Sequence, residues 1–402
     1  MKIGIIIQKL NFGGAERCAS NLSIDFEEKF DTHLIVFDGE NQMYPHGGVL
    51  HDLKSQPTHN KIKKILNAIS RINKVKRIKK KEKFDCVISL LTGANYVNVM
   101  STCGERTIVS IRNNLSNSGL SSAEKNMVIK SGKLADCVVC LSESVRQDMI
   151  HNFGVDEKKA VTIYNSVDAK RLQKLADETS DENSIAINGD YIVTMGRLMY
   201  QKGQWHLIRA FSEIHKKFPD LKLVILGEGE DEFSENIKHL VKKMGLEEVI
   251  LFPGYIKNPH KIIRDSLMFV FPSLYEGLGN VLLEALACGK AVISTDCLSG
   301  PREILAPNTT LQITENKELR DIEYAEYGIL VPAFEHKEDF DTVEVIPEEQ
   351  ILANAVCELL GSEKLKSDYE LAAKKRVLDF SPEKITADWE RIIKMLWVEK
   401  HG

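Results

Sequence analysis

Residues 271–290 read FPSLYEGLGNVLLEALACGK and join the end of an apolar strand to a helix through a turn that contains two glycines. We expect the strand to end at Phe271, the helix to begin near Asn280, and Gly289 to end it in a left-handed conformation. A strand, a glycine-containing turn and a helix in this order form the repeating unit of parallel α/β domains. This segment therefore predicts the fold class of the chain.

The same alternation of short apolar runs and helix-length segments extends in both directions from this segment. Strands are expected at residues 3–7, 33–37, 86–90, 107–111, 137–141 and 161–164. A second series is expected at 191–195, 222–226, 249–252, 268–271, 291–294 and 328–331. A polar stretch, residues 165–190, separates the two series. We predict two doubly wound α/β domains, residues 1–175 and 186–378, followed by a C-terminal helix within residues 379–402.

The C-terminal helix has an apolar stripe and is expected to pack against another part of the chain. The stripe consists of Ile385, Trp389, Ile392, Ile393, Leu396 and Trp397.

The composition is that of a folded globular protein: 402 residues, 43% hydrophobic and 28% charged, with a net charge of −5. The absence of a net positive charge argues against a nucleic-acid partner. No apolar run reaches the length of about 18 residues that a membrane span needs, and the N-terminus becomes polar too soon for a secretory signal. We therefore expect a cytoplasmic protein whose eight cysteines are reduced.

Two patterns are typical of metal sites but lack the partners that such sites require. Cys137 and Cys140 form a CxxC pair inside an expected strand, with no second pair, so we expect two buried thiols. His46, His51 and His59 show no ligand spacing and are expected to be solvated. We predict no metal and no other cofactor.

Residues 61–83, KIKKILNAISRINKVKRIKKKEK, predict a basic amphipathic helix with eleven Lys or Arg residues and one acid, Glu82. One helical face would hold Ile62, Ile65, Leu66, Ile69, Ile72, Val75 and Ile78. A helix of this kind suits an anionic membrane surface. A solvated helix that covers its own domain with its apolar face explains the pattern equally well.

The turn in residues 271–290 also has the features of an anion site. Free backbone N–H groups and the positive end of the helix dipole at residues 277–281 can bind a phosphate, and glycine allows close approach. Glu276 lies just outside the helix start and Glu284 about one turn inside it. Phosphates need donors and hydroxyls need acceptors, so this combination suits a sugar nucleotide. A surface turn with solvated acids is the alternative.

A second cluster follows the strand at residues 191–195, where Gly196 and Arg197 precede Lys202 at a helix start. Arginine grips a diphosphate through two hydrogen bonds and lysine supplies a point charge, so the pair could neutralise a nucleoside diphosphate without a metal. Two ordinary solvated cations are the alternative. The position favours binding, because ligands of parallel sheets bind at the carboxyl ends of the strands.

Two further glycine turns follow strands. Gly13-Gly14-Ala15-Glu16 repeats the order of strand, double glycine and helix start in the first domain, and could face the same diphosphate across a cleft. Gly227-Glu-Gly-Glu-Asp231 is a partial dinucleotide-binding pattern whose acids would repel a pyrophosphate. We interpret it as a turn near the base or ribose.

Taken together, these motifs resemble those of the retaining nucleotide-sugar glycosyltransferases of family 4. The matching segments occur in the family's order and extend over nearly the whole chain. They are Gly13–Glu16, Gly196-Arg197 with Lys202-Gly203, Gly227–Glu230, Phe252-Pro-Gly-Tyr255 and Pro272–Glu276, with the Glu276/Glu284 pair as the most specific mark. The resemblance implies the GT-B architecture, in which two Rossmann-like domains face each other across a cleft and a C-terminal helix returns to the first domain.

The resemblance also implies roles for individual residues. Arg197 and Lys202 would bind the diphosphate of the donor, assisted by backbone amides near Gly277, Leu278, Gly279, Asn280 and Val281. Glu284 would hold the ribose and Glu276 the transferred sugar. The Gly254–Tyr255 region would frame the base, usually uracil, and Glu303 would support the back of the donor site. Trp389 and Trp397 would pack the returning helix.

One position departs from the family's pattern. Many members have a histidine facing the sugar at the end of the strand near residue 110, where this chain has Arg112 and Asn113. Arginine cannot act as a base near neutral pH, so Arg112 is assigned to phosphate or sugar contacts. A front-face mechanism tolerates this change, because the departing diphosphate oxygen accepts the proton of the acceptor.

These expectations describe a metal-independent, retaining transferase that moves a hexose or N-acetylhexosamine from a UDP-sugar to an acceptor hydroxyl. A polyprenyl-diphosphate-linked oligosaccharide of O-antigen or capsule synthesis is the expected acceptor, and the inner face of the cell membrane the expected location. Two alternatives stay open. One is a nucleotide-sugar epimerase of the same architecture; the other is a non-catalytic protein that binds sugar nucleotides.

Overall fold

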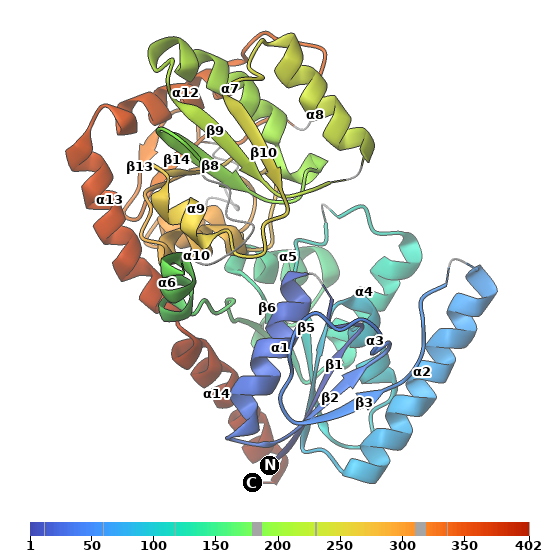
Figure 1. The fold of residues 1–402 in the computed structure, drawn as a ribbon. Coiled ribbons are helices and arrows are strands. Elements are labelled where there is room, and N and C mark those ends of the chain that lie inside the picture. The colour runs from blue at the N-terminus through green and yellow to red at the C-terminus, as the bar shows by residue number, and fades with distance from the viewer. Residues whose placement is uncertain are drawn as a thin grey trace. The chain divides into compact units, whose positions relative to one another are not determined.

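The computed structural model describes residues 1–401 except 12, 59, 117, 179–186, 230, 310–318 and 336. His59 and Glu230, which belong to patterns discussed above, lie outside the described residues. Within this part of the chain, contacts define two compact units, one formed by residues 1–166 and 382–402 and the other by residues 167–381 (Figure 1). Each unit has its own sheet.

The first unit contains a seven-stranded, entirely parallel sheet in the order β3-β2-β1-β4-β5-β6-β7. Its strands are β1 (Lys2–Ile7), β2 (Asp31–Val36), β3 (Val49–Asp52), β4 (Cys86–Leu90), β5 (Arg106–Ile111), β6 (Cys137–Cys140) and β7 (Ala160–Thr162). Its helices are α1 (Gly14–Glu27), α2 (Lys61–Glu82), α3 (Thr92–Met100), α4 (Ser122–Leu134), α5 (Glu143–Phe153) and α14 (Pro382–His401), with the short 3₁₀ turn η1 (Glu157–Lys159).

Helices cover both faces of this sheet, which explains why its central strands are continuously apolar. Ile5 of β1 faces α1 and α14, whereas Ile6 faces α2 and α3. Trp389 of α14 is 1% exposed and lies in the same cluster as Ile5. Trp397 is 37% exposed, so it is covered less completely than Trp389.

The second unit contains another seven-stranded sheet, in the order β10-β9-β8-β11-β12-β14-β13, in which β13 is antiparallel to its neighbour. Its strands are β8 (Tyr191–Met195), β9 (Lys222–Leu226), β10 (Ile250–Gly254), β11 (Phe269–Phe271), β12 (Val292–Thr295), β13 (Glu323–Tyr324) and β14 (Ile329–Val331). Its helices and 3₁₀ turns are α6 (Ala169–Asp177), η2 (Tyr200–Lys202), α7 (Gln204–Lys217), α8 (Asp231–Lys243), α9 (His260–Asp265), α10 (Asn280–Ala287), α11 (Pro301–Leu305), α12 (Pro347–Leu360), α13 (Glu363–Arg376) and η4 (Val377–Phe380).

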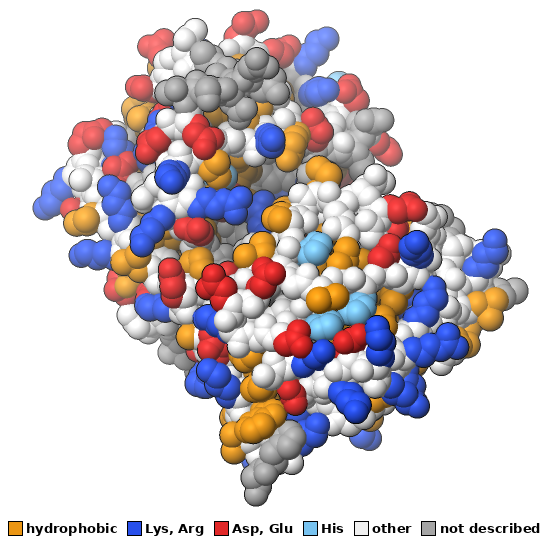
Figure 2. Space-filling model, turned by 60° about the horizontal axis from the view of Figure 1, so that its bottom comes forward, with side chains coloured by type: hydrophobic (Ala, Val, Ile, Leu, Met, Phe, Trp, Pro, Cys, Tyr) orange, Lys and Arg blue, Asp and Glu red, His pale blue; other side chains and the backbone are white. Residues whose placement is uncertain are grey.

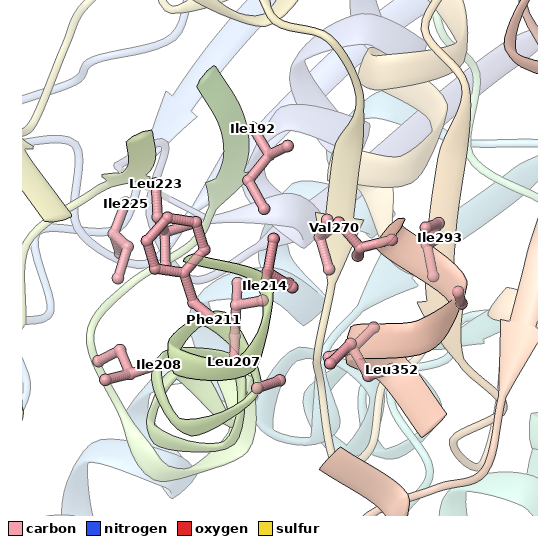
Figure 3. Packing of buried hydrophobic residues seen from close by; sticks show 14 of the residues in the cluster. Ile192, Leu207, Ile208, Phe211, Ile214, Leu223, Ile225, Val270, Ile293 and Leu352 are labelled. Carbon is pink, nitrogen blue, oxygen red and sulfur yellow. The ribbon is translucent and has the colours of Figure 1, made fainter. Parts of the chain in front are cut away.

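The largest core cluster of the second unit lies between its sheet and the helices α7 and α12 (Figure 3). Phe211 of α7 points toward Leu223 and Ile225 of β9, and Leu352 of α12 lies near Val270 and Ile293 (Figure 3). The twelve strands expected from the sequence all form, and the doubly wound α/β class is confirmed.

Several details differ from the sequence-based expectations. The short strands β3 and β13 were not anticipated. The first unit ends at residue 166 rather than 175, because α6 packs on α9 and α10, with Gln173 donating to Ala287 O at 3.2 Å. His46 and His51, expected to be solvated, are half-buried, since loops and neighbouring strands cover them. Cys137 and Cys140 are buried in β6 as expected.

Candidate active site

The strand order of each sheet reverses direction at one point, between β1 and β4 in the first unit and between β8 and β11 in the second. Ligands of doubly wound sheets bind outside the carboxyl ends of the strands at such points. In the second unit, the segments that leave β8 and β11 at this edge carry Arg197, Lys202 and Glu276. The second unit thus brings together the residues expected to bind a donor.

Glycine is required for the turn after β8. Gly203 has a φ of +59° and connects η2 to α7; a Cβ there would lie 2.3 Å from Pro272 O. Gly227, after β9, has a φ of +128°, and a Cβ would lie 2.2 Å from Gly196 O. These close backbone approaches fix the loop that carries Arg197 and Lys202. The close packing of Gly227 against Gly196 therefore holds the loop with Arg197 and Lys202 in place.

The Lys202 ammonium and the Glu276 carboxylate form the centre of the site, with Nζ 2.5 Å from Oε1. Glu276 also accepts hydrogen bonds from Ser273 Oγ at 2.8 Å and from Gln201 Nε2 at 3.3 Å. Its side chain is 8% exposed and that of Lys202 18%. The carboxylate is thus buried with donors around it, while part of the ammonium reaches the surface. A charged pair held in this way can exchange one partner for a ligand.

The helix start after β11 matches the expectation closely. Gly279, with a φ of +88°, caps α10, whose first residue is Asn280. The cap residue Gly279 has no side chain to bond to this end, and the start of a helix is a place where backbone N–H groups can receive an anion. Gly277, Leu278 and Gly279 are buried under the turn, and Asn280 and Val281 are half-buried.

Glu284 lies one turn inside α10 and is buried. His260 Nε2, at the start of α9, lies 3.4 Å from Glu284 Oε2, and His260 Nδ1 is 2.9 Å from Asn258 Oδ1. The imidazole therefore lies beside the carboxylate on the buried side of α10. Sequence analysis missed His260 as well as Gln201 and Ser273, because contacts between distant segments leave no local spacing.

Arg197 differs from Lys202 in its surroundings. Its side chain is exposed, and its guanidinium makes no hydrogen bond or ion pair with the described residues. The local structure is nevertheless fixed, since Gln204 Nε2 donates to Arg197 O at 2.9 Å. Because no carboxylate of the described residues pairs with this guanidinium, its N–H groups can donate to a bound anion.

Other residues expected near a donor lie around the same sheet edge. Glu228 Oε1 accepts the N–H of Tyr255 at 3.2 Å, which links the turn after β9 to the one after β10. The Tyr255 side chain is 56% exposed and offers a ring surface to a base. Glu303 is buried in α11, where its carbonyl accepts from Arg376 at 2.7 Å.

Two cysteines close to the central carboxylates are excluded as nucleophiles. Burial and the charge of Glu284 raise the pKa of Cys288 to about 12. Burial, with Glu276 nearby, raises the pKa of Cys297 above the range in which it could ionise. Both thiols stay protonated near neutral pH, so neither can supply a thiolate.

The remaining expected residues belong to the first unit. Gly13 and Gly14 are exposed at the start of α1, and the Glu16 side chain lies against Gly13. Arg112, at the carboxyl end of β5, is buried, donates to Ser110 Oγ at 3.2 Å and contacts Asn165 Oδ1. Its Nε is buried without a hydrogen-bond partner among the described residues. Asn113 is exposed beside it.

Comparison with known families agrees with this arrangement. The family described as Glycosyltransferase Family 4 matches residues 12–171, and the family described as Glycosyl transferases group 1 matches residues 176–325. Both halves of the chain thus match glycosyltransferase families, and the chain is a glycosyltransferase. Its two sheets are those of the GT-B fold, which confirms the resemblance inferred from the motifs.

Similar proteins align with this glycosyltransferase over most of its length. A Campylobacter jejuni protein named N-acetylgalactosamine-N,N'-diacetylbacillosaminyl-diphospho-undecaprenol 4-alpha-N-acetylgalactosaminyltransferase is 29% identical over 96% of this chain and 98% of its own. An uncharacterised glycosyltransferase of Methanocaldococcus jannaschii is 35% identical over 65% of this chain, and the chain spans 64% of that protein. Anabaena HepE, solved with UDP and glucose, superposes with a TM-score of 0.74 at 16% identity, over 98% of this chain and all of HepE.

Proposed function

We propose that this glycosyltransferase moves a hexose or N-acetylhexosamine from a UDP-sugar to a hydroxyl of a polyprenyl-diphosphate-linked saccharide, with retention of configuration. The observation that carries the proposal is the Lys202–Glu276 pair before the start of α10, with Lys202 on the same loop as Arg197, for which the described residues provide no ion-pair partner. Two cations and the start of a helix match a diphosphate, while the adjoining carboxylates match sugar hydroxyls.

The donor would be bound by groups that already have fixed positions. Arg197, Lys202 and the first N–H groups of α10 would neutralise the two phosphates without a metal. Glu284, beside His260, would accept from the ribose hydroxyls. Glu276 would accept from the transferred sugar and hold the Lys202 ammonium beside the leaving oxygen.

In the reaction, the bond from the anomeric carbon to the diphosphate oxygen breaks as the acceptor oxygen attacks from the same face. The acceptor proton passes to the departing diphosphate oxygen, so no protein base is needed. Lys202 and Arg197 stabilise the negative charge that develops there. Arg112, with its buried and unsatisfied Nε, would hold a phosphate or sugar group of the substrates rather than take a proton.

Two comparisons support the choice of substrates. The printed name of the Campylobacter relative describes transfer to a saccharide on diphospho-undecaprenol. HepE, whose structure contains UDP and glucose, shares the fold. Both statements concern those proteins, and the donor and acceptor of this chain follow from them only as parts of the proposal.

A thermal-shift screen of UDP-, GDP- and ADP-sugars tests the donor, since a ligand that binds the folded state raises the midpoint of unfolding. We expect the UDP-sugars to give the largest shift, and Arg197→Ala to lose it while Lys238→Ala, on the outer side of α8, retains it. An equal shift with all three nucleotides would contradict the choice of uridine. Incubation of the donor alone, with no acceptor, separates transfer from epimerisation.

The same proposal places the protein on an anionic membrane surface through α2. Ile65, Leu66 and Ile69 are each more than half exposed, whereas Val75 is buried against the sheet. Figure 2 shows Lys and Arg side chains spread over the face that it draws, interspersed with acidic ones. The exposed basic residues of α2 are Lys63, Lys64, Lys76, Arg77, Lys80 and Lys81, and Lys83 follows directly after the helix. Apolar side chains beside lysines on an exposed helix suit insertion among anionic headgroups.

The basic residues of α2 do not all have the same role. Arg71 and Lys74 bind carbonyls of Ser55 and Leu53, and Lys79 is buried against Glu105 at 2.6 Å. A lipid test should therefore leave these three unchanged. No helix among the described residues has the length and apolar character needed to cross a membrane.

Flotation with anionic and neutral vesicles tests the surface. We expect Lys63, Lys64, Lys76 and Lys80 changed together to Gln to reduce binding to anionic vesicles, and Ile65→Ser with Ile69→Ser to do the same. Lys216, Lys217, Lys238 and Lys242, four exposed lysines of the second unit, changed together to Gln are the control of equal charge. Unchanged flotation of both α2 variants would remove the membrane from the proposal.

A further inference from the structure

Two histidines and a glutamate meet on the face of the first sheet that α2 covers. His33 and His51 come from the neighbouring strands β2 and β3, and Glu82 is the last residue of α2. One ligand atom of each lies within 4.8 Å of the others. His33 Nδ1 is 2.8 Å from His51 Nε2, and the two rings stack with 5.1 Å between centroids.

The register of the sheet accounts for this cluster. His51 pairs with Ile35, two residues beyond His33, so both imidazoles lie on the face that α2 covers. Phe84, just after α2, contacts the edge of the His33 ring, with 5.2 Å between centroids. His33 is buried, while His51 and Glu82 are half-buried and can be reached from solvent.

We propose that His33, His51 and Glu82 bind a divalent transition metal of the zinc class, which fixes β3 and the end of α2 to the first sheet. Two imidazoles and a carboxylate are a ligand set that such ions prefer. His33 is the third residue of β2 and Glu82 ends α2, so the site lies on the face of the sheet and not beyond the carboxyl ends of the strands, where substrates of this fold bind. The metal would therefore serve the fold rather than the transfer reaction.

A second carboxylate supports this assignment. Asp31 Oδ1 lies 3.2 Å from His33 Nε2, the nitrogen that faces away from His51. Metal-binding histidines characteristically donate the other ring N–H to a carboxylate, which fixes the tautomer and orients the ligand nitrogen. With the His33 Nε2–H directed at Asp31, the lone pair of His33 Nδ1 faces His51 Nε2, and a metal would replace the proton between these two nitrogens.

Two lysines form ion pairs with the carboxylates of Asp31 and Glu82 and would compete with a metal for them. Lys2 Nζ lies 3.1 Å from Asp31 Oδ2 and 3.3 Å from Glu82 Oε2, and Lys81 Nζ lies 3.4 Å from Glu82 Oε1. Lys81 is 81% exposed, so its side chain can leave at little cost. A metal must therefore displace Lys81, and removal of this ammonium should favour binding.

Calorimetric titration of the chelator-treated full chain with Zn²⁺ tests the proposal. We expect one Zn²⁺ per chain, at least tenfold weaker binding in His51→Gln, and a loss of about 10- to 100-fold in Asp31→Asn. Lys81→Gln should bind more tightly than the unchanged protein, which a merely structural role of the cluster would not predict. His239→Gln, an exposed histidine on α8, is the matched control and should bind as the unchanged protein does.

Co²⁺ provides a second measurement that identifies the ligand atoms. With nitrogen and oxygen ligands, the visible bands of Co²⁺ should appear without the near-ultraviolet band of a thiolate ligand, and Cys103→Ser should not alter them. The proposal is overturned if no Zn²⁺ binds at one equivalent, if His51→Gln retains full affinity while folded by circular dichroism, or if the Co²⁺ spectrum is that of a thiolate. Because none of these readouts depends on sugar transfer, failure here leaves the proposed function intact.

Discussion

Among the proposed catalytic residues, Lys202 would act most directly on the charge of the leaving group. Its ammonium lies 2.5 Å from Glu276 and is partly exposed, so it is held in place and still accessible to a phosphate. We expect Lys202→Ala to lower kcat by about 10²- to 10³-fold, as removal of a preorganised donor does elsewhere. Steady-state kinetics with the donor found by the screen measure this, and Lys238→Ala controls for loss of a lysine. Turnover at the unchanged rate would show that Lys202 does not stabilise the leaving group.

At the same scale, residue types near the turns could be predicted but their partners could not. The positions of Arg197, Lys202, Glu276 and Glu284 follow from spacing relative to strands, which places them at one sheet edge. The hydrogen bonds from Gln201 and Ser273 to Glu276 depend on how two loops meet, and no local pattern encodes that. The burial of Arg112 was likewise not predictable, because a strand end gives no sign of what covers it.

The turn after β9 gives a prediction at the scale of an element. Gly227 and Gly245 both have a positive φ, but a Cβ on Gly227 would lie 2.2 Å from Gly196 O, whereas Gly245 has open space around it. Gly245→Ala should cost about 1 to 2 kcal/mol of unfolding free energy from backbone strain alone. Gly227→Ala should cost more and should also weaken donor binding, because the Gly196 loop must move. Denaturant unfolding and thermal shift with donor measure the two effects, and equal costs would contradict the close approach.

Strands and helices marked by an apolar run or a glycine turn were predicted, whereas elements without such a pattern were missed. Continuous apolar runs gave β8 and β9 with their observed bounds, and a glycine turn gave the start of α10. Strand β3, Val-Leu-His-Asp, lies at a sheet edge and is half polar, so it has no apolar run to detect. Because His51 belongs to β3, missing this strand also concealed its contact with His33.

At the scale of the whole molecule, we expect α14 to stabilise the first unit as strongly as the segments near the N-terminus do. Trp389 is buried in the cluster that holds Ile5, and Trp397 is 37% exposed. We expect Trp389→Ala to lower the free energy of unfolding of the first unit by about 3 to 5 kcal/mol. Trp397→Ala is the matched control and should change it far less. Chemical denaturation followed by circular dichroism measures both, and equal effects would contradict the burial of Trp389.

Acid sensitivity of the first unit is expected from Asp136. Burial tends to raise the pKa of Asp136, but hydrogen bonds from Thr107 and Arg106 outweigh burial and lower it below the ordinary value. The folded state therefore binds this proton less readily than the unfolded state. Its stabilising effect is present above about pH 4, the unfolded pKa, and is lost as the pH falls through the folded pKa.

Asp136→Asn should consequently reduce stability at pH 7 by roughly 1 to 2 kcal/mol, since a neutral amide accepts these hydrogen bonds more weakly. The difference from the unchanged protein should shrink below about pH 4. Urea unfolding at pH 7 and pH 3.5 measures it. A difference that stays constant between the two pH values would show that Asp136 does not titrate differently on folding.

The return of α14 to the first unit has a consequence for biosynthesis. Residues 167–381 form a continuous stretch, whereas the first unit needs residues from both ends of the polypeptide. On the ribosome, the second unit can complete its core as soon as residue 381 emerges, although it is made later. The half that is translated first is finished last, and until residues 382–402 emerge its Ile5 face lacks the cover of Trp389. Chains that stop twenty residues early would carry a complete second unit beside an unfinished first one.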